Sequence, residues 1–328
     1  MPNILVTGGA GYIGSHTVHL LRGRGYNVTV IDDLSRGHRH NVEGAAFYQA
    51  NLLDTNAVAE VMQRERFDAI VHFAAYIAVG ESTQKPELYF TNNVSGSISL
   101  FTAMERAGIK RIVFSSTAAV YGTPERVPIL EDFPYAPLSP YGESKIMVEK
   151  ILGWLDEFKS VRSICLRYFN ACGAEPGSGL GEEHDPETHL IPLLLRAVQT
   201  GKPVTIFGED YPTPDGTCIR DYIHVSDLAE AHIVAVESLL HDGPSNKFNA
   251  GTGRGTSVRE VIAAVEEITG QKVPYTVGPR RAGDPAELVA NSDKLQKTLG
   301  WTPHYTDIRE VVRTAWDFQR AVTSPASR

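Results

Sequence analysis

Tyr141 and Lys145, in the stretch "SPYGESK", are the residues whose spacing first suggests chemistry. On a helix, residues four positions apart share one face. A tyrosine with a pKa of about 10 is a poor base at neutral pH, but a nearby ammonium and a helix N-terminus both favour the phenolate. We therefore hypothesise that Tyr141 is an acid–base group assisted by Lys145. The alternative is a tyrosine ring that packs on the stem of a solvated lysine.

A third candidate, Thr117, lies 24 residues before Tyr141 and directly follows a predicted strand, "KRIVFSS". In open parallel sheets, ligands bind beyond the carboxyl ends of the strands. A hydroxyl at this place can bridge between the phenol and a substrate hydroxyl. Ser139 is typical of a helix N-cap and Pro140 of a first turn, so the sequence predicts that the helix with Tyr141 begins here.

A glycine-rich stretch, "ILVTGGAGYIGSH", places Gly8, Gly9, Gly11 and Gly14 directly after the first predicted strand. Glycine permits a tight turn and a close approach of the backbone to a pyrophosphate at a helix N-terminus. Asp32 ends the next predicted strand, eighteen residues after Gly14. A carboxylate there can bind the ribose hydroxyls and repels a 2′-phosphate. The sequence therefore predicts a dinucleotide site that prefers NAD to NADP.

Short apolar runs alternate with helical patterns in the first half of the chain, which is typical of βαβ units and a parallel sheet. We expect strands in "NILVTGG", "NVTVIDD", "FDAIVHFAA", "KRIVFSS" and "VRSICLRYFN", and helices at Ser15–Gly25, Thr55–Arg66 and Asn93–Ala107. The predicted fold is α/β, a Rossmann-type doubly wound parallel sheet with a smaller C-terminal substrate-binding domain. We expect the NAD-binding domain at 1–170, the second, partly interleaved domain at 171–320, and a tail at 321–328.

Composition excludes several classes of function. The formal net charge of −8 argues against a nucleic-acid partner or an anionic membrane surface. No apolar run reaches the length of about 18 residues that a membrane span needs. The three cysteines, Cys165, Cys172 and Cys218, are not spaced like zinc ligands. We therefore expect no metal site, no membrane partner and a reducing, cytoplasmic location.

The chain resembles the UDP-glucose 4-epimerase family of extended short-chain dehydrogenases/reductases, to about Trp316. The motifs that carry the resemblance are "TGGAGYIGSH", "HFAAYIAVGES", "NNVSGS", "SSTAAVYG", "SPYGESK", "RYFNACGA", "IFGEDYPTPDGTCIRDYIHVSDLA" and "RRAGDPAELVA". It implies an NAD-dependent isomerase of galactose metabolism, which interconverts UDP-glucose and UDP-galactose through a transient 4-keto sugar. It also implies a homodimer formed by helices near Asn93–Ala107 and Tyr141–Phe158.

The resemblance implies a role for each matching residue. Tyr141 would be the acid–base, Lys145 would hold the nicotinamide ribose, and Thr117 would be the hydroxyl partner that also contacts substrate. Cofactor contacts are expected at Gly8, Gly11, Tyr12, Ile13, Gly14, Asp32, Asp33, Leu34, Ser35, Arg36, Gly37, Asn51, Leu52, Phe73, Ala74, Ala75, Ile77, Asn92, Tyr141, Lys145 and Phe169. UDP-sugar contacts are expected at Thr117, Asn170, His189, Leu190, Thr205, Phe207, Arg220, Arg281, Asp284 and Leu288.

At four positions the chain differs from residues that are common in the family. Ile77 stands where some members have a cofactor-contacting lysine, His189 where asparagine is common, and Ala75 where glycine is frequent. Leu288 stands where members have either tyrosine or a small residue near C2 of the sugar. Leucine there implies UDP-glucose and UDP-galactose as the main substrates, with some activity on UDP-N-acetylglucosamine.

Three other functions are compatible with parts of this pattern. An epimerase of another UDP-sugar, such as a UDP-N-acetylhexosamine, a pentose or a uronate, remains open. A sugar-nucleotide 4,6-dehydratase needs an acid and a base, but Ala118 and Ala119 follow Thr117. A non-catalytic NAD-sensing regulator would not need Tyr141, Lys145 and Thr117 together.

Overall fold

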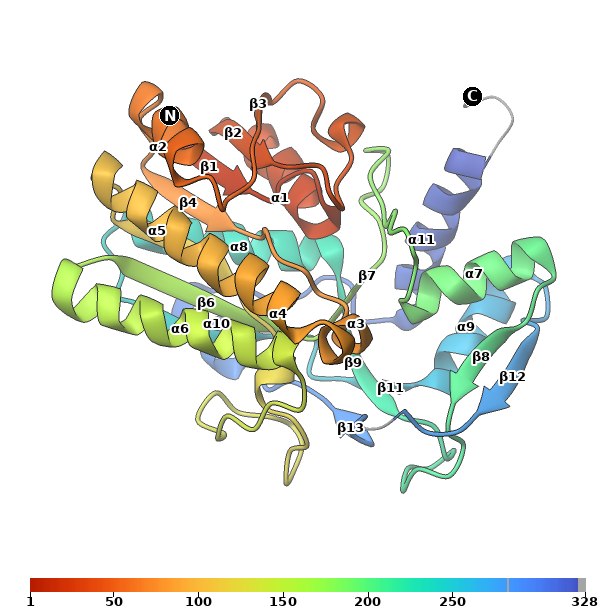
Figure 1. Ribbon diagram of the computed structural model, residues 1–328. Coiled ribbons are helices and arrows are strands. Elements are labelled where there is room, and N and C mark those ends of the chain that lie inside the picture. The colour runs from red at the N-terminus through yellow and green to blue at the C-terminus, as the bar shows by residue number, and fades with distance from the viewer. Residues whose placement is uncertain (282, 324–328) are drawn as a thin grey trace.

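A seven-stranded parallel sheet forms the centre of the larger part of the molecule (Figure 1). The computed structural model describes residues 1–281 and 283–323. The strand order is β3-β2-β1-β4-β5-β6-β10, and every neighbouring pair is parallel. The strands are β1 (Asn3–Thr7), β2 (Asn27–Asp32), β3 (Ala46–Gln49), β4 (Ala69–His72), β5 (Arg111–Ser115), β6 (Arg162–Tyr168) and β10 (Asn246–Ala250).

Helices cover both faces of this sheet (Figure 1). Helices α1 (Tyr12–Gly23) and α8 (Val225–Leu240) lie on one face, and α2 (Thr55–Arg64), α5 (Gly96–Ala107) and α6 (Pro140–Lys159) lie on the other. Side chains alternate between the faces along a strand. In β1, Ile4 and Val6 accordingly join the core beside α1 and α8, whereas Leu5 joins the core beside α2 and α5. This arrangement confirms the predicted doubly wound parallel sheet.

The strand order reverses at β1. From β1 the chain proceeds outward through β2 to β3, and then returns to β4 on the other side of β1. In such sheets the crevice beyond the carboxyl ends of the two central strands is the usual ligand site. The glycine-rich stretch follows β1 and residues 73–75 follow β4, so both lie at this crevice.

A smaller set of elements packs around its own apolar core. It contains a sheet in the order β11-β9-β13, with β7 paired to β9, and a two-stranded sheet of β8 and β12. Its elements are β7 (Asn170–Cys172), α7 (Leu190–Thr200), β8 (Val204–Phe207), β9 (Ile219–His224), β11 (Gly255–Ser257), α9 (Val258–Thr269), β12 (Tyr275–Gly278), β13 (Glu287–Leu288) and α11 (Ile308–Thr323). Between β9 and β11 the chain returns to the large sheet, where it forms helix α8 and strand β10. The division into domains at residue 170 stays a prediction.

Several predicted boundaries need correction. Helix α1 begins at Tyr12 rather than Ser15, because Gly11 in extended backbone already forms its N-cap. The expected helix from Asn93 is a π-helix at Phe90–Ser95 that continues into α5 at Gly96. The single strand expected in "VRSICLRYFN" is divided at Phe169, where the chain leaves the large sheet and β7 joins the smaller one.

Some short elements were not predicted. Strands β3 and β10 are four and five residues long and contain polar residues, which hides the apolar run. The other short elements are η1 (Arg39–Val42), α3 (Val79–Gln84), α4 (Pro86–Tyr89), η3 (Ala118–Val120) and α10 (Asp293–Leu299). Within the described residues, no helix is long and apolar enough to cross a membrane. Residues 321–323 of the expected tail continue α11, and 324–328 lie outside the described residues.

Candidate active site

The glycine-rich turn brings the end of β1 against the end of β4. Gly8 has a φ of +71°, and a Cβ added there would lie 2.5 Å from the Ala74 nitrogen. A Cβ at Gly14 would lie 2.3 Å from the Gly8 oxygen. Gly11 caps α1 without any side-chain bond to the first amides of the helix. These contacts require glycine at positions 8 and 14 and leave a helix N-terminus that suits an anion.

Asp32, at the end of β2, is held by the same turn. Its carboxylate accepts hydrogen bonds from the Ala10 nitrogen at 3.0 Å and the Leu34 nitrogen at 2.8 Å. Burial raises the pKa of this carboxyl, while these two amides oppose the change. The neighbouring Asp33 accepts from the Asn51 side-chain amide at 2.7 Å and from the Ser35 nitrogen at 2.9 Å. The turn after β2 and the loop after β3 are thus joined by predicted cofactor residues.

The other predicted cofactor residues are spread over the same edge of the sheet. Phe73 and Ala74 follow β4, and both backbone nitrogens donate to the Thr7 oxygen. Asn92 lies in the π-helix, where its side chain donates to the Asn93 side chain at 3.0 Å. Ile77 is 41% exposed, and its aliphatic side chain offers no polar group to a cofactor. Phe169 packs at the rim, between β6 and β7.

Thr117, Tyr141 and Lys145 converge just beyond the end of β5. Thr117 caps η3, and its hydroxyl accepts from the Ala119 nitrogen at 3.1 Å. Tyr141 is the second residue of α6 and is buried. The Lys145 ammonium donates to the Ser115 carbonyl at 2.8 Å and lies 5.9 Å from the centre of the Tyr141 ring. The N-cap that the sequence predicts at Ser139 is present, because its hydroxyl accepts from the Gly142 nitrogen at 3.2 Å.

Burial dominates the electrostatics of this group. It raises the pKa of Tyr141 to about 12, and a hydrogen bond with Thr117 lowers that pKa only in part. Burial also lowers the pKa of Lys145 to about 7, against the opposing charge of Glu149. In the protein alone, burial therefore outweighs the groups that favour the phenolate. The activation of Tyr141 by Lys145, the helix N-terminus and a cationic nicotinamide together stays a prediction.

A buried ion pair supports helix α6, which carries Tyr141 and Lys145, and the sequence did not predict it. Arg167 of β6 and Glu149 of α6 form two hydrogen bonds, from Nε to Oε1 at 3.0 Å and from Nη2 to Oε2 at 2.7 Å. The Ser116 hydroxyl also donates to Glu149, at 2.6 Å. The available signal was an arginine inside the buried strand "SICLRY" and an acid one turn beyond Lys145.

Several predicted UDP-sugar residues come together in the smaller part of the fold. Arg220 of β9 forms an ion pair with Asp284. The Arg281 guanidinium lies 4.1 Å from the centre of the Phe207 ring. Leu288 of β13 is paired in register with Arg220 and packs beside Phe169. Arg220 and Asp284 are 64 residues apart in the sequence, and Phe207 and Arg281 are farther apart still. The fold nevertheless brings the members of each pair into contact.

The remaining predicted substrate residues lie farther along the same elements. Asn170 begins β7 and is exposed. Thr205 of β8 faces Thr276, with 3.3 Å between the two hydroxyl oxygens. His189 caps α7 and Leu190 begins that helix.

His189 is held by two carboxylates, which the sequence analysis did not foresee. Its Nδ1 lies 2.6 Å from Glu182 Oε1 and 3.0 Å from Glu187 Oε1. Burial alone would lower the pKa of this imidazole, but the two carboxylates outweigh it and raise the pKa to about 10. The sequence signal was two Glu-x-His units in "EEHDPETH".

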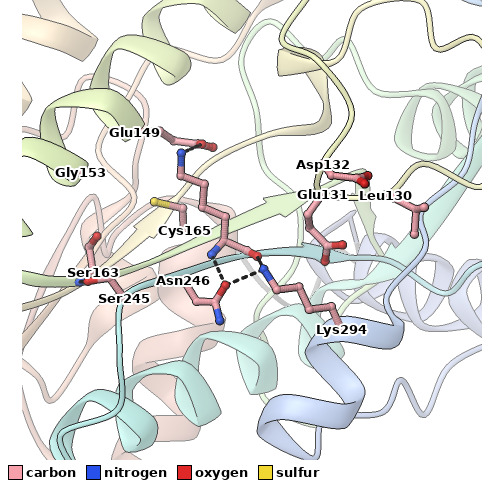
Figure 2. A pocket seen from close by; sticks show the side chains of 11 residues that line it. Leu130, Glu131, Asp132, Glu149, Gly153, Ser163, Cys165, Ser245, Asn246 and Lys294 are labelled. Carbon is pink, nitrogen blue, oxygen red and sulfur yellow. Dashed lines mark hydrogen bonds and ion pairs between the residues drawn. The ribbon is translucent and has the colours of Figure 1, made fainter.

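A cavity of about 630 Å³ lies away from these residues, at the other end of β6 (Figure 2). None of the predicted site residues lines it. Lys294 reaches across it to the Asn246 side chain at 2.6 Å, and Lys247 lies 3.4 Å from Glu149. The cavity therefore borders the supporting ion pair and is separate from the candidate active site.

Comparisons with known proteins show which proteins the chain is similar to. Residues 4–251 match the NAD dependent epimerase/dehydratase family. The chain is 50% identical to the UDP-glucose 4-epimerase of Lacticaseibacillus casei, over 96% of both chains. A crystal structure of the UDP-glucose 4-epimerase from Brucella ovis in complex with NAD has a TM-score of 0.94 and 45% identity, over 97% of this chain and 98% of that one. The enzyme from Bifidobacterium longum in complex with NAD⁺ and UDP has a TM-score of 0.92 and 36% identity, over 99% and 100%.

Proposed function

Because the chain belongs to the NAD dependent epimerase/dehydratase family, we propose that it interconverts UDP-glucose and UDP-galactose by inverting C4 of the sugar. The observation that carries this proposal is the convergence of Thr117, Tyr141 and Lys145 at the end of β5, beside the glycine-rich turn. Two close relatives by identity and fold are UDP-glucose 4-epimerases. The proposed enzyme is an isomerase with NAD as its cofactor.

The residues present fit NAD. A Cβ at Gly8 or Gly14 would meet backbone, so the turn keeps a cradle of the shape that a pyrophosphate needs. Asp32 offers a carboxylate where the adenosine ribose would lie. When bound, NAD supplies reversible hydride acceptance at C4 of the sugar. We propose that the other predicted cofactor residues, from Tyr12 to Phe169, line this site.

Tyr141 is the proposed acid–base. Its phenolate takes the proton of the sugar 4-hydroxyl as the 4-keto sugar forms, and returns that proton when the opposite face is reduced. Thr117 bridges the phenol and the substrate hydroxyl, and Lys145 holds the nicotinamide ribose. Burial raises the pKa of Tyr141 in the protein alone, and the positive charge of a bound nicotinamide would favour the phenolate.

Arg220, Arg281 and Asp284 are the proposed residues for the UDP moiety, with Phe207 beside the uracil. Planar guanidinium groups suit a diphosphate because they bind it with two hydrogen bonds. Arg220 is paired with Asp284, so we expect that carboxylate to orient it. Asn170, His189, Leu190 and Thr205 are proposed for the remaining substrate contacts, and Leu288 for the sugar pocket.

We also propose a homodimer formed through α5 and α6. Four large apolar side chains on these helices are exposed: Ile98 at 47%, Met147 at 37%, Trp154 at 61% and Phe158 at 72%. The Trp154 and Phe158 rings are stacked, with centroids 5.7 Å apart. Exposed apolar residues gathered in this way mark contact surfaces. Sedimentation equilibrium should give twice the mass of the chain, and a lower mass in Trp154→Glu.

A cytoplasmic location is the expectation that goes with three free, buried cysteines. We propose no nucleic-acid or membrane partner, since the net charge of −8 opposes polyanionic surfaces.

The activity is tested by incubating the purified protein with a panel of UDP-sugars and identifying the products by chromatography. We expect UDP-galactose and UDP-glucose to reach the same equilibrium mixture from either side, without added reductant or oxidant. Equilibration of UDP-pentoses or UDP-uronates alone would replace this substrate assignment. Binding of NAD without turnover of any UDP-sugar would favour the NAD-sensing regulator.

A further inference from the structure

The segment before α7 contains two Glu-x-His units, Glu182 to His184 and Glu187 to His189. Each of these four residues can offer one ligand atom, and the four atoms all lie within 4.8 Å of one another. All four donors belong to one stretch of eight residues, 182–189, so they are close in the sequence as well as in space. None of them belongs to the Thr117, Tyr141 and Lys145 group. His189 is also a proposed substrate contact, so the variants that test the metal site leave it unchanged.

The distances describe a compact set of donors. Glu182 Oε1 lies 2.6 Å from His189 Nδ1 and 3.1 Å from His184 Nδ1. Glu187 contributes Oε1 at 3.0 Å from His189 Nδ1 and Oε2 at 4.0 Å from His184 Nδ1. A tetrahedral zinc site with bonds of about 2.0–2.2 Å requires donors that are about 3.3 Å apart. The observed separations, from 2.6 to 4.0 Å, lie on both sides of this value.

The cluster brings together two carboxylates, whose negative charges suit a bound cation. The side chains of Glu182 and Glu187 are only 6% and 1% exposed. Among the described residues, their ion-pair partners are the two imidazoles, and no lysine or arginine lies within ion-pair distance of either carboxylate. In the metal-free protein the ion pairs with the imidazoles offset the two buried carboxylates. A dication bound by neutral imidazoles would take over this role, because metal binding releases the protons of its ligands.

We propose that Glu182, His184, Glu187 and His189 form a Zn²⁺ site. Imidazole and carboxylate donors suit zinc, whereas Mg²⁺ and Ca²⁺ prefer sites made entirely of oxygen. The Glu187 carboxylate is already oriented, since its Oε1 accepts from the Thr188 and His189 nitrogens at 2.7 and 2.8 Å. Hydrogen bonds that orient a ligand are common around metal sites.

The role of the metal follows from where the segment lies. The His184 ring packs edge-on against Tyr12 of α1, with centroids 6.1 Å apart. His38 Nε2 lies 2.9 Å from the Glu183 carbonyl, and His189 caps α7. A zinc ion would therefore fix the segment between the start of α1 and the start of α7. It is a structural ion and takes no part in the proposed proton transfer.

The test is a titration of the untagged full-length protein with Zn²⁺ after chelator treatment, followed by calorimetry at pH 7.5. The wild type should bind one equivalent. Glu182→Gln should weaken this binding at least tenfold, because it removes the donor closest to both imidazoles. Glu183→Gln is the matched control: Glu183 adjoins the cluster, pairs with His40 at 2.9 Å, and should leave zinc affinity within twofold of wild type.

A second readout is the visible spectrum with Co²⁺ in place of Zn²⁺, which should show tetrahedral absorption in the wild type and in Glu183→Gln only. If Glu182→Gln does not fold by circular dichroism, His184→Ala carries the same test. The proposal fails if the wild type binds no zinc at 0.1 mM, or if a folded Glu182→Gln or His184→Ala binds within threefold of wild type. Either result would mean that the cluster is a proton-sharing ion-pair network. The outcome is independent of turnover, so it leaves the proposed epimerase activity untouched.

Discussion

Arg167 and Glu149 form a bidentate ion pair beneath helix α6, which carries Tyr141, with side chains that are 2% and 0% exposed. Glu149 lies one turn beyond Lys145 on α6, and Arg167 lies on β6. The pair therefore fixes the helix that carries Tyr141 against the sheet.

Glu149→Gln should destabilise the protein by about 3–5 kcal/mol, because it leaves the Arg167 charge buried without a partner. Urea unfolding of the variant and wild type measures the difference. The control is Glu105→Gln, which breaks an exposed ion pair with Lys159 and should leave the unfolding midpoint unchanged. A midpoint for Glu149→Gln equal to that of the control would show that the pair does not support the fold.

Lys145 should make stability depend on pH in the cofactor-free protein. Its pKa is about 7 in the folded chain, against 10.5 as the ordinary value. Between these two pH values the unfolded chain binds a proton that the folded chain does not, so stability increases as pH rises through this window. From pH 7 to 9 the wild type should gain about 2 kcal/mol relative to Lys145→Met. The free energy of unfolding is measured for both proteins at both pH values. A difference between wild type and Lys145→Met that is the same at pH 7 and pH 9 would exclude the shifted pKa.

Asp32 should determine the choice of NAD over NADP. Its carboxylate is fixed by two backbone amides, where it would oppose a 2′-phosphate. Mass spectrometry of the nucleotide released on denaturation should detect NAD as the main species. Asp32→Asn keeps the shape and removes the charge, so NADP affinity relative to NAD should rise on the order of tenfold, about 1.4 kcal/mol. NADP as the main species in the wild type would contradict this role.

Leu288 should set the range of sugars. It is partly buried and packs in the cluster that contains Ala118, next to Thr117. Leucine leaves more room than tyrosine and has no hydroxyl that an acetamido group would strand without a partner. We expect UDP-N-acetylglucosamine to be turned over by the wild type and at least tenfold less by Leu288→Tyr, in kcat/KM, with UDP-galactose within threefold. Equal values for UDP-N-acetylglucosamine in both proteins would mean that Leu288 only packs the loop.

Local patterns predicted the parts of the molecule that depend on neighbours in sequence. The spacing of Tyr141 and Lys145 predicted their shared helix face, and the strand before Gly8 predicted the turn that the structure contains. The α/β sheet followed from buried apolar strands between helices. These features need no knowledge of the rest of the fold.

Contacts between distant segments could not be predicted in the same way. Arg220 meets Asp284 only because β9 and β13 become neighbours in a small sheet. The shift in the pKa of Tyr141 depends on how fully the helix is covered, which spacing does not reveal. The Glu182 and His189 cluster lies in a stretch rich in glycine and proline, where no periodicity indicates which side chains face each other.

The turnover of UDP-galactose by Tyr141→Phe is the most direct test of the proposal that Tyr141 is the acid–base of the epimerase. The phenol is the only group of the three converging side chains assigned to proton transfer, and general acid–base catalysis contributes about 10²–10⁴-fold. We predict that kcat falls by about 10² or more, while NAD remains bound and the protein stays folded. The control is Tyr26→Phe, which removes a hydroxyl that donates to Glu237. Tyr26 follows the C-terminal end of α1, opposite to the end with the glycine-rich turn, so this variant should retain the wild-type rate. A kcat for Tyr141→Phe within threefold of wild type would contradict the assignment of Tyr141 as the acid–base.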